Sequence, residues 1–367
     1  MPWYTLANVD EIDSPALLVY PDRVRENVRR MIAYAGGVER LRPHVKTHKM
    51  PAVVKLQLEA GITRFKCATL AEAEMVAACG AADVLLAYQP VGPKAARFAQ
   101  LVKKFPAVRF SALIDDPAAA RALSAALAAA GVSAEVLLDI DNGMGRTGIA
   151  PGAEAMALYA LLGDLPAVSP VGLHVYDGQV RDRDLAARTA ASDAAFVPVD
   201  QMRDELARRG FPRPRVVAGG TPTFPIHALH ADRECSPGTC AFWDASYESK
   251  FPDLEFLHAA LLLTRVISKP AAGRVCLDLG YKAVSPDNPD PRAVFLDVPD
   301  ARMVNHSEEH LAIETSRAEE LHVGDALYAI PWHVCPTCAL HSAAIVVENG
   351  LAVDRWPVTA RDRKITV

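Results

Sequence analysis

Two kinds of segment alternate between about residues 41 and 242: short runs rich in β-branched residues, and alanine-rich stretches with helical spacing. We count eight runs of the first kind, at residues 41–45, 64–68, 83–88, 110–114, 135–140, 171–176, 215–217 and 239–242. A strand followed by a helix, repeated eight times, predicts an α/β fold of the (β/α)8 TIM barrel type. A doubly wound open sheet is the competing fold, but no G-x-G-x-x-G motif follows the first run.

The pattern changes after residue 251, where strand-like segments are separated by Gly, Pro and Asp turns without long helices between them. These segments, at residues 261–266, 274–279, 293–298, 326–330 and 343–347, predict a separate all-β domain. Residues 14–20 are also strand-like, and we expect them to pair with this domain before a helix at residues 21–35. The expected organisation is a barrel over residues 22–250 and a β domain formed by residues 1–21 with 251–367.

Composition and charge exclude several classes of function. Of the 367 residues 51% are hydrophobic, which permits a large core. The net charge of -5, with both signs mixed along the chain, gives no electrostatic footprint for nucleic acid. No apolar stretch is long enough to span a membrane, and the first residues lack the features of a secretory signal. Seven cysteines, an odd number without framework spacing, favour reduced thiols and a cytoplasmic location.

Basic and imidazole side chains are concentrated at residues 42–49, with the sequence Arg-Pro-His-Val-Lys-Thr-His-Lys. The segment follows a strand-like run and precedes a stretch of helical spacing, so Lys46 is expected at the carboxyl end of a strand. Lysine forms Schiff bases with carbonyl cofactors, and nearby cations such as Arg42 favour its uncharged form. Lys46 is therefore a candidate covalent catalyst, with Lys49 and Lys66 as weaker rivals. The alternative is a solvated basic loop.

Barrel enzymes carry their active sites at the carboxyl ends of the strands, often with phosphate held by the loops after strands seven and eight. Arg146 lies in a glycine-rich turn after the fifth predicted strand, and a Gly-Gly-Thr turn at residues 219–221 follows the seventh. Such a turn offers N–H groups and a hydroxyl to a phosphate dianion, although the same residues also form ordinary tight turns. The candidate residues at these strand ends are Lys46, Arg146, His174, Tyr176, Gly219, Gly220, Thr221 and Cys240.

A lysine, an anion-binding turn and an arginine at one barrel mouth are what a pyridoxal 5′-phosphate enzyme requires. In this interpretation Lys46 captures the cofactor aldehyde, and the turn at residues 219–221 binds the cofactor phosphate. Arg146 then faces either the phenolate oxygen of the cofactor or the carboxylate of the substrate.

A second group of candidate residues lies in the expected β domain, within the sequence Trp-His-Val-Cys-Pro-Thr-Cys. In an extended segment His333 and Cys335 point to the same side, where imidazole and thiolate bind one metal ion. A structural thiol beside a core histidine is the alternative, since a metal site needs further ligands. Residues of the same domain that offer further ligand groups are His306, Glu309 and His310.

Five motifs, at residues 42–49, 145–148, 219–223, 237–239 and 333–337, cover nearly the whole chain in order. Together they resemble the D-threonine aldolase and D-serine dehydratase group of alanine racemase-like, fold-type III pyridoxal phosphate enzymes. The resemblance implies a barrel plus a β domain, a homodimer with sites near the subunit interface, and Lys46 as the Schiff-base lysine. It also implies a divalent metal held by His333 and Cys335, for which thiolate and imidazole favour Zn²⁺ over Mn²⁺ or Mg²⁺.

Two reactions are open within this group. The resemblance implies an aspartate as second metal ligand in the aldolases, with a histidine base shortly after the strand-six tyrosine, and a cysteine ligand in the dehydratases. Here Cys335 is the ligand and residues 179–182 contain no histidine, which favours elimination. His174 or a metal-bound water is the replacement base for an aldol cleavage. Cys240 stands where relatives commonly have tyrosine, so a contact to the cofactor or substrate differs in this chain.

We therefore expect a pyridoxal phosphate- and metal-dependent lyase that eliminates the β-hydroxyl of β-hydroxy-D-amino acids, giving a keto acid and ammonia. The alternatives are retro-aldol cleavage to glycine and an aldehyde, racemisation with Tyr176 as a second acid or base, and binding of the cofactor without turnover. The D preference is implied by the resemblance. D-Serine, D-threonine and 3-hydroxy-D-aspartate all remain open as substrates.

Overall fold

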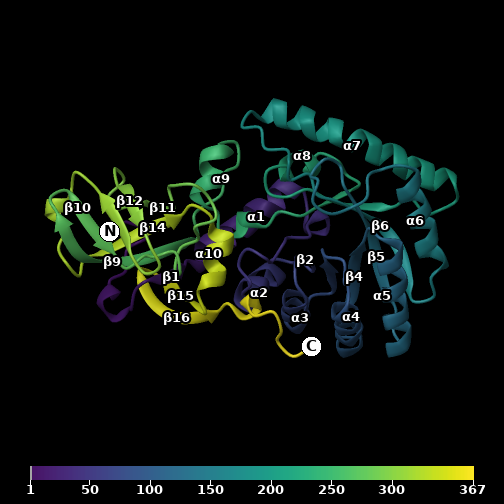
Figure 1. Ribbon diagram of the computed structural model, residues 1–367, viewed down its shortest axis with the longest axis horizontal. Helices are drawn as coiled ribbons and strands as arrows, with labels where there is room; N and C mark the ends of the chain where they lie inside the picture. Colours follow the sequence, from purple (N-terminus) through teal and green to yellow (C-terminus); the bar gives the residue numbers. More distant parts are fainter. Residues whose placement is uncertain (1) are drawn as a thin grey trace. The chain divides into compact units, whose positions relative to one another are not determined.

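The computed structural model describes residues 2–367, which divide into two compact units (Figure 1). The first, which we call the barrel unit, contains residues 29–46, 54–238 and 362–367. The second, the β unit, contains the described residues up to 28 together with 47–53 and 239–361. The chain therefore passes between the units more than once, and the expected domain boundaries at residues 22 and 250 stay a prediction.

Within residues 2–367, the barrel unit contains seven parallel strands in the order β2-β3-β4-β5-β6-β7-β8. Helices connect these strands, and Figure 1 shows α4, α5 and α6 alongside the strands that they join. The strands are β2 (Arg64–Cys67), β3 (Asp83–Leu86), β4 (Arg109–Ile114), β5 (Ala134–Ile140), β6 (Val168–Val175), β7 (Arg215–Ala218) and β8 (Arg233–Cys235). The helices are α2 (Pro51–Glu59), α3 (Leu70–Ala78), α4 (Pro93–Lys104), α5 (Pro117–Ala130), α6 (Ala153–Asp164), α7 (Leu185–Arg208) and α8 (Phe224–Ala228).

The predicted first strand closes the sheet into a barrel without forming a full strand itself. Leu41 forms an isolated bridge with Cys235 of β8, and His44 forms another with Lys66 of β2. Pro43 has no N–H group to pair, but its carbonyl accepts a hydrogen bond of 2.9 Å from the Lys66 N–H. Because this segment joins the two edges of the sheet, the predicted (β/α)8 barrel is confirmed.

The predicted eighth strand, at residues 239–242, is wrong. The eighth position of the barrel is taken by β8, whereas Thr239–Ala241 forms a 3-10 turn, η3. The Thr239 carbonyl accepts hydrogen bonds from the N–H groups of Phe242 and Trp243, which coils the chain at this point. β8 is short and its Arg-Glu-Cys sequence carries two charges, so it gives little hydrophobic signal.

The helix starts of the barrel unit are explained by local side chains. The Thr69 hydroxyl caps α3 by accepting a hydrogen bond of 3.1 Å from the Glu72 N–H. Asp116 caps α5 in the same way through the Ala119 N–H at 2.8 Å, with a proline at the first helical position. Gly131 ends α5 in the left-handed conformation, with a φ of +71°. These caps set where the strand-to-helix connections begin and end.

Arg42 is fully buried at the barrel closure, where two carboxylates neutralise its charge. Its Nη1 donates to Oδ1 of Asp83 at 2.6 Å, and its Nε donates to Oε2 of Glu234 at 2.7 Å. Burial opposes the ionisation of Asp83, but the hydrogen bond from Arg42 outweighs it and lowers the pKa of this carboxyl group. The network therefore joins β3 and β8 to the segment that closes the barrel.

Replacing Asp83 with alanine (D83A) is expected to lower the free energy of unfolding by about 3–5 kcal/mol, because it leaves the Arg42 charge buried with one partner removed. Urea unfolding monitored by circular dichroism measures this loss. The matched control is Asp204→Ala, which removes an exposed ion pair with Arg213 and is expected to cost less than about 1 kcal/mol. Equal losses in the two variants would contradict the structural role of the Arg42 network.

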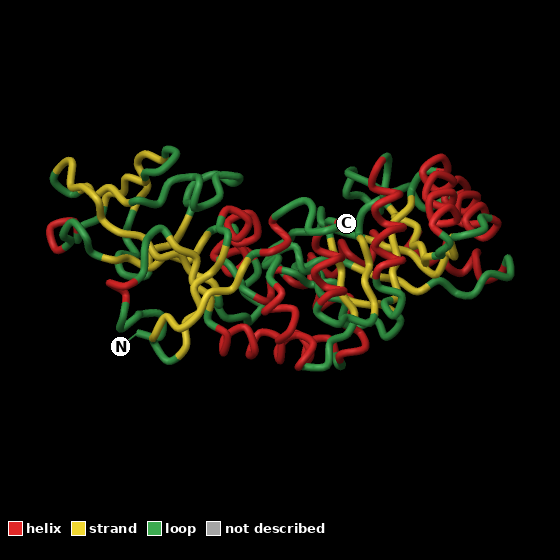
Figure 2. Tube along the Cα trace, turned by 90° about the horizontal axis from the view of Figure 1, so that it is seen from below, coloured by secondary structure: helices red, strands yellow, loops and turns green. Residues whose placement is uncertain are grey.

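The β unit contains a mixed sheet, whose strand order among the described residues is β12-β13-β10-β9-β1-β15-β16, with β14 pairing β9 and β11. β1 pairs antiparallel with β9 and parallel with β15, so the expected pairing of residues 14–20 with this unit is confirmed. Figure 2 shows these strands in yellow with only short helices among them. The strands are β1 (Ala16–Val19), β9 (Ala260–Ala271), β10 (Arg274–Leu277), β11 (Ala293–Phe295), β12 (Arg302–His306), β13 (Leu311–Glu314), β14 (Ala326–Pro331), β15 (Ala343–Glu348) and β16 (Leu351–Pro357).

The β unit has its own hydrophobic core. Leu18 of β1 packs with Leu261 and Leu263 of β9 and with Tyr328 and Ile330 of β14. Residues two apart on a strand face the same side, so each of these strands contributes one apolar face. The remaining helices are α1 (Pro21–Ala35), α9 (Ala245–Lys250) and α10 (Val334–Leu340). No helix in the part of the chain that the structure describes is both long and apolar enough to cross a membrane.

Candidate active site

Three cationic side chains of the barrel unit surround the ring of Tyr176, which follows β6. The Nζ atoms of Lys46 and Lys66 each lie 5.9 Å from the ring centroid, and the guanidinium carbon of Arg146 lies 4.9 Å from it. Lys46 and Arg146 are exposed, whereas Lys66 is buried. The structure therefore brings the predicted lysine and arginine together on one aromatic ring, and adds a second lysine to them.

The predicted phosphate-binding turn packs against the same ring. A Cβ atom on Gly220 would lie 2.9 Å from Cε2 of Tyr176, so only glycine lets the backbone approach the ring this closely. The Thr221 hydroxyl accepts a hydrogen bond of 3.1 Å from the Gly238 N–H, which joins the loops that follow β7 and β8. Lys46 and the turn thus both lie close to one ring, an arrangement that suits a small phosphorylated aldehyde.

A buried carboxylate fixes the shape of this turn. Asp177 accepts hydrogen bonds from Oγ1 of Thr223 at 2.7 Å and from Nε2 of His227 at 2.8 Å. Burial opposes its ionisation, but His227 outweighs burial and lowers the pKa of Asp177. Gly219 has a φ of +67°, and a Cβ atom on it would lie 2.4 Å from Cδ2 of His227. Sequence reasoning missed Asp177 and His227, although Asp177 directly follows the strand-six tyrosine.

His174 is buried, and both of its ring nitrogens are engaged. Nδ1 lies 2.7 Å from Oδ1 of Asp139, and Nε2 lies 3.2 Å from Nζ of Lys66. Burial, followed by the charge of Lys66, lowers the pKa of His174, so its imidazole is neutral at pH 7. The structure therefore connects His174 to the Tyr176 cluster through Lys66. Sequence reasoning considered Lys66 only as a rival for the cofactor aldehyde.

The same region contains a buried hydroxyl without a protein partner. The Ser236 side chain is buried, and no hydrogen-bond partner among the described residues reaches its Oγ. Its backbone N–H donates to the Ala218 carbonyl, so Ser236 lies beside the start of the phosphate-binding turn. A buried hydroxyl is stabilised when a ligand satisfies it. This hydroxyl, the cation cluster and the glycine turn together fit pyridoxal phosphate, which carries an aldehyde, a phenolate oxygen and a phosphate.

Cys240, which we expected to contact the cofactor or substrate, is fully buried in η3. It belongs to the β unit, which includes residues 239–361. The other predicted cofactor-binding residues all belong to the barrel unit. A contact between Cys240 and the cofactor therefore stays a prediction.

The His333 and Cys335 side chains interact with each other in the β unit, but not within the extended segment that we expected. α10 begins at Val334, so Cys335 lies in its first turn. Pro336 does not interrupt this turn, because a proline in the first turn removes no helical hydrogen bond. The Thr337 hydroxyl donates to the His333 carbonyl at 2.8 Å and stabilises the helix start. The extended geometry is wrong, whereas the two side chains are adjacent.

The pKa values of His333 and Cys335 shift in opposite directions, so each side chain favours its charged form. Although burial opposes its charge, Cys335 and Asp287 raise the pKa of His333 to about 9. Burial also opposes ionisation of Cys335, but His333 outweighs it and lowers the pKa of the thiol. Oδ2 of Asp287 lies 2.6 Å from Nδ1 of His333, which leaves Nε2 for a metal. An imidazole nitrogen and a readily ionised thiol fit Zn²⁺.

Further metal ligands are not gathered around this pair. No group of three or more His, Cys, Asp or Glu side chains within residues 2–367 is arranged to hold a metal ion. Glu309 lies 3.6 Å from Nζ of Lys282, and the His306 ring packs edge-on against Tyr281 with the centroids 5.8 Å apart. His306, Glu309 and His310 therefore do not join the pair as the expected further ligands.

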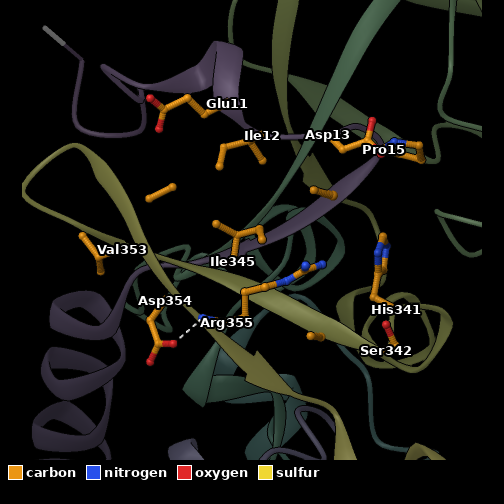
Figure 3. A pocket seen from close by; sticks show the side chains of 13 residues that line it. Glu11, Ile12, Asp13, Pro15, His341, Ser342, Ile345, Val353, Asp354 and Arg355 are labelled. Carbon is orange, nitrogen blue, oxygen red and sulfur yellow. Dashed lines mark hydrogen bonds between the residues drawn. The ribbon is translucent and has the colours of Figure 1, made fainter.

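A pocket of about 520 Å³ in the β unit lies apart from the predicted residues. Figure 3 shows its walls, to which the N-terminal segment and β16 contribute Glu11, Ile12, Asp13, Val353, Asp354 and Arg355. None of the predicted catalytic, cofactor-binding or metal-binding residues lines it. This pocket is therefore not the candidate active site.

Comparisons with known proteins show that this chain matches the models of two domain families. Residues 19–245 match the alanine racemase N-terminal domain, and residues 259–347 match the "Putative serine dehydratase domain". D-threonine aldolase from Arthrobacter sp. is 32% identical over 366 residues, which cover 95% of this chain and 93% of that protein. 3-Hydroxy-D-aspartate aldolase from Paracoccus denitrificans is 31% identical, with coverages of 96% and 93%.

Solved structures share the fold. D-threonine aldolase from Filomicrobium marinum has a TM-score of 0.88 and 31% identity, covering 96% of each chain. A D-threo-3-hydroxyaspartate dehydratase variant, with alanine in place of a histidine, has a TM-score of 0.84 and 25% identity over 96% of each chain. A variant with alanine in place of a cysteine two positions further along, in its metal-free form, has a TM-score of 0.79 and 25% identity, with coverages of 94% and 97%. This chain belongs to the D-threonine aldolase and D-serine dehydratase family of alanine racemase-like enzymes and is a pyridoxal phosphate-dependent lyase.

Proposed function

We propose that this enzyme eliminates the β-hydroxyl group from β-hydroxy-D-amino acids, so that the products are a keto acid and ammonia. The observation that carries the proposal is the thiol of Cys335 beside the imidazole of His333. The two residues are two positions apart, which is the spacing of the histidine and cysteine replaced in the dehydratase variants. The metal-free form of the cysteine variant supports a divalent metal at His333 and Cys335, with Zn²⁺ preferred to Mn²⁺ or Mg²⁺.

The side chains of the barrel unit have separate roles in this proposal. Pyridoxal phosphate, when bound, withdraws the negative charge that develops at the substrate Cα. Lys46 would hold the cofactor through its amine, and the same amine would serve as the base that removes the Cα proton of the substrate. The N–H groups of the turn at Gly219, Gly220 and Thr221 bind the phosphate, and Arg146 binds an anionic oxygen. Lys46, Arg146 and Gly220 all lie near the ring of Tyr176.

The residues of the β unit hold the proposed metal. A metal at His333 and Cys335 supplies a Lewis acid for the hydroxyl oxygen that leaves the substrate. Asp287 fixes the His333 ring through Nδ1, and the Thr47 hydroxyl lies 3.2 Å from the Cys335 sulfur. These two contacts orient the nitrogen and the sulfur before a metal binds.

Retro-aldol cleavage is the second candidate, because the two relatives at 31% and 32% identity are named aldolases. Cleavage needs a base that accepts the proton of the β-hydroxyl group. Residues 179–182 contain no histidine, and His174 already bonds Asp139 and Lys66 through its two ring nitrogens. These observations support elimination over cleavage.

We also propose that the enzyme is a homodimer in the cytoplasm. The dimer is what the family resemblance implies. All seven cysteines are free thiols, which supports a reducing compartment.

Product analysis decides between the two reactions. The enzyme, loaded with pyridoxal phosphate and Zn²⁺, is incubated separately with D-serine, D-threonine and 3-hydroxy-D-aspartate. The expected products are a keto acid and ammonia in equal amounts, with Lys46→Ala as the control that forms neither. Glycine with an aldehyde as the major products would overturn elimination in favour of aldol cleavage.

A further inference from the structure

A second lysine is buried inside the barrel, close to the proposed cofactor lysine. Lys66 is the third residue of β2, and its side chain is only 3% exposed to solvent. Its backbone pairs with Leu85 of β3 on one side and bonds the closing segment through Pro43 on the other. The position of its backbone is therefore fixed by the barrel. Long charged side chains are rarely buried without a specific role or partner.

The partner of Lys66 is a short chain of polar side chains. The Lys66 Nζ lies 3.2 Å from Nε2 of His174, and Nδ1 of His174 lies 2.7 Å from Oδ1 of Asp139. Oδ2 of Asp139 accepts a hydrogen bond of 2.9 Å from the Thr147 hydroxyl. Because Asp139 accepts from Nδ1, that nitrogen carries the imidazole proton and Nε2 accepts from Lys66. Lys66 thus gives one N–H to His174 and keeps the rest of its amine for another ligand.

The charges that face Lys66 favour its neutral form in the free protein. Burial, followed by the charge of Lys46, lowers the pKa of Lys66 to about 7. The titratable and charged groups that act on it are Lys46 from the closing segment, Arg146 from the turn after β5, Asp139 of β5, His174 of β6, and Asp177, which follows β6. An anion that enters this region would reverse the balance and favour the ammonium form.

The proposed ligands bring such anions. Pyridoxal phosphate carries a phenolate oxygen and the amino-acid substrate carries a carboxylate, so two anionic oxygens need cations beside the Tyr176 ring. Arg146 is one cation, and Lys46 is committed to the cofactor aldehyde. Lys66, whose Nζ lies 5.9 Å from the Tyr176 centroid, is the remaining cationic side chain of the cluster defined above.

We propose that Lys66 is a second anion-binding residue of this active site, which takes up a proton when an anionic oxygen enters the space beside the Tyr176 ring. The inference rests on the proposed function, because it assumes that the cofactor and substrate bind there. The proton comes from solvent and remains on Nζ, and no covalent bond forms or breaks. His174 and Asp139 are positioning residues in this account, since they hold the Lys66 amine and touch no ligand.

Proton uptake on ligand binding tests the proposal. Apoprotein in weakly buffered solution at pH 8, with a pH indicator dye, is mixed with pyridoxine 5′-phosphate, which lacks the aldehyde and cannot react with Lys46. With a pKa of about 7, roughly one tenth of the Lys66 side chains are protonated at pH 8 before binding. The wild type is therefore expected to take up as much as about 0.9 more proton per site than Lys66→Met.

A second arm separates the two sources of the anion. Protein already loaded with pyridoxal phosphate is mixed with D-alanine, which has a carboxylate but no β-hydroxyl group to lose. Extra uptake in the first arm assigns Lys66 to an anionic oxygen of the cofactor, and extra uptake confined to the second arm assigns it to the substrate carboxylate. Either result supports the proposal.

Two further variants control the experiment. Lys55→Met removes an exposed lysine of α2 and is expected to take up protons as the wild type does. Lys66→Gln keeps an N–H donor for His174 without a titrating amine, and it replaces Lys66→Met if that variant does not fold. Equal proton uptake by the wild type and the folded Lys66 variant in both arms would overturn the role of Lys66 and leave the proposed function intact. Failure of pyridoxine 5′-phosphate and pyridoxal phosphate to bind the wild type would overturn the proposed function and this inference together.

Discussion

Replacing Lys46 with alanine (K46A) is expected to abolish the visible absorption band of the pyridoxal phosphate-loaded protein and to lower turnover by about 10³- to 10⁴-fold. Lys46 is exposed and its amine lies near the Tyr176 ring, which the turn at Gly220 also approaches. Without it, the cofactor has no covalent attachment at this position and the Cα proton has no base. Absorption spectra and initial rates with D-serine measure the two effects.

Lys49→Ala is the matched control for this prediction. The Lys49 Nζ donates to the Ala360 carbonyl at 3.5 Å within the β unit, so its amine has a structural contact. The Lys49 variant is expected to keep the absorption band and most of the activity. A band that survives in K46A but disappears in Lys49→Ala would move the covalent attachment to the rival lysine.

Removal of the proposed metal is expected to have the next largest effect. A chelator should lower turnover by at least about 10²-fold, since a Lewis acid that stabilises the leaving hydroxide would be lost. Zn²⁺ should restore activity more fully than Mn²⁺ or Mg²⁺, because thiolate and imidazole ligands favour it. Cys335→Ala should reproduce the loss without a chelator, and metal analysis of the purified variant should show less bound zinc.

Cys338→Ala controls for the loss of a buried thiol from the same helix. Burial raises the pKa of the Cys338 thiol well above its ordinary value, so this side chain is a neutral core residue of α10. Its variant is expected to bind zinc and turn over substrate as the wild type does. Full activity of chelator-treated, metal-free wild type would remove the metal from the proposed mechanism.

The barrel and its attached β unit were predictable because their signals are local. Residues 21–35 carry helical spacing and form α1 with the expected bounds, and residues 14–20 contain β1. The position of β8 was not predictable in this way, because Arg233–Cys235 contains no apolar run. This segment is recognised as a strand by its pairing with β7 in the folded barrel. The segment at residues 239–242 resembles a strand in sequence because it is apolar. Its side chains are apolar because the turn is buried.

The candidate site also contains residues that local sequence predicts and contacts that it does not predict. Lys46, Arg146 and Gly220 follow strands, and the rule that barrel sites lie at strand ends was enough to single them out. The contact between Lys66 and His174 joins residues 108 positions apart across the barrel, and no local pattern indicates it. Their side chains meet because the barrel closes, so only the three-dimensional structure reveals the connection.

The pair of His333 and Cys335 shows how the start of a helix changes the prediction. Residues 333–335 were interpreted as an extended segment, whereas α10 begins at Val334 and Pro336 lies in its first turn. Proline is tolerated at that position because the N–H groups of the first turn have no helical partner. The adjacency of His333 and Cys335 survives the change, since residues at a helix start and two positions later remain close.

Trapping the cofactor on the protein tests the central claim most directly. Sodium borohydride reduces the bond between a lysine and pyridoxal phosphate to a stable amine, and peptide mass spectrometry then identifies the modified residue. The account predicts the added cofactor mass on Lys46. The same mass on Lys49 or Lys66, or no modified lysine in protein that has been loaded with pyridoxal phosphate, would contradict it.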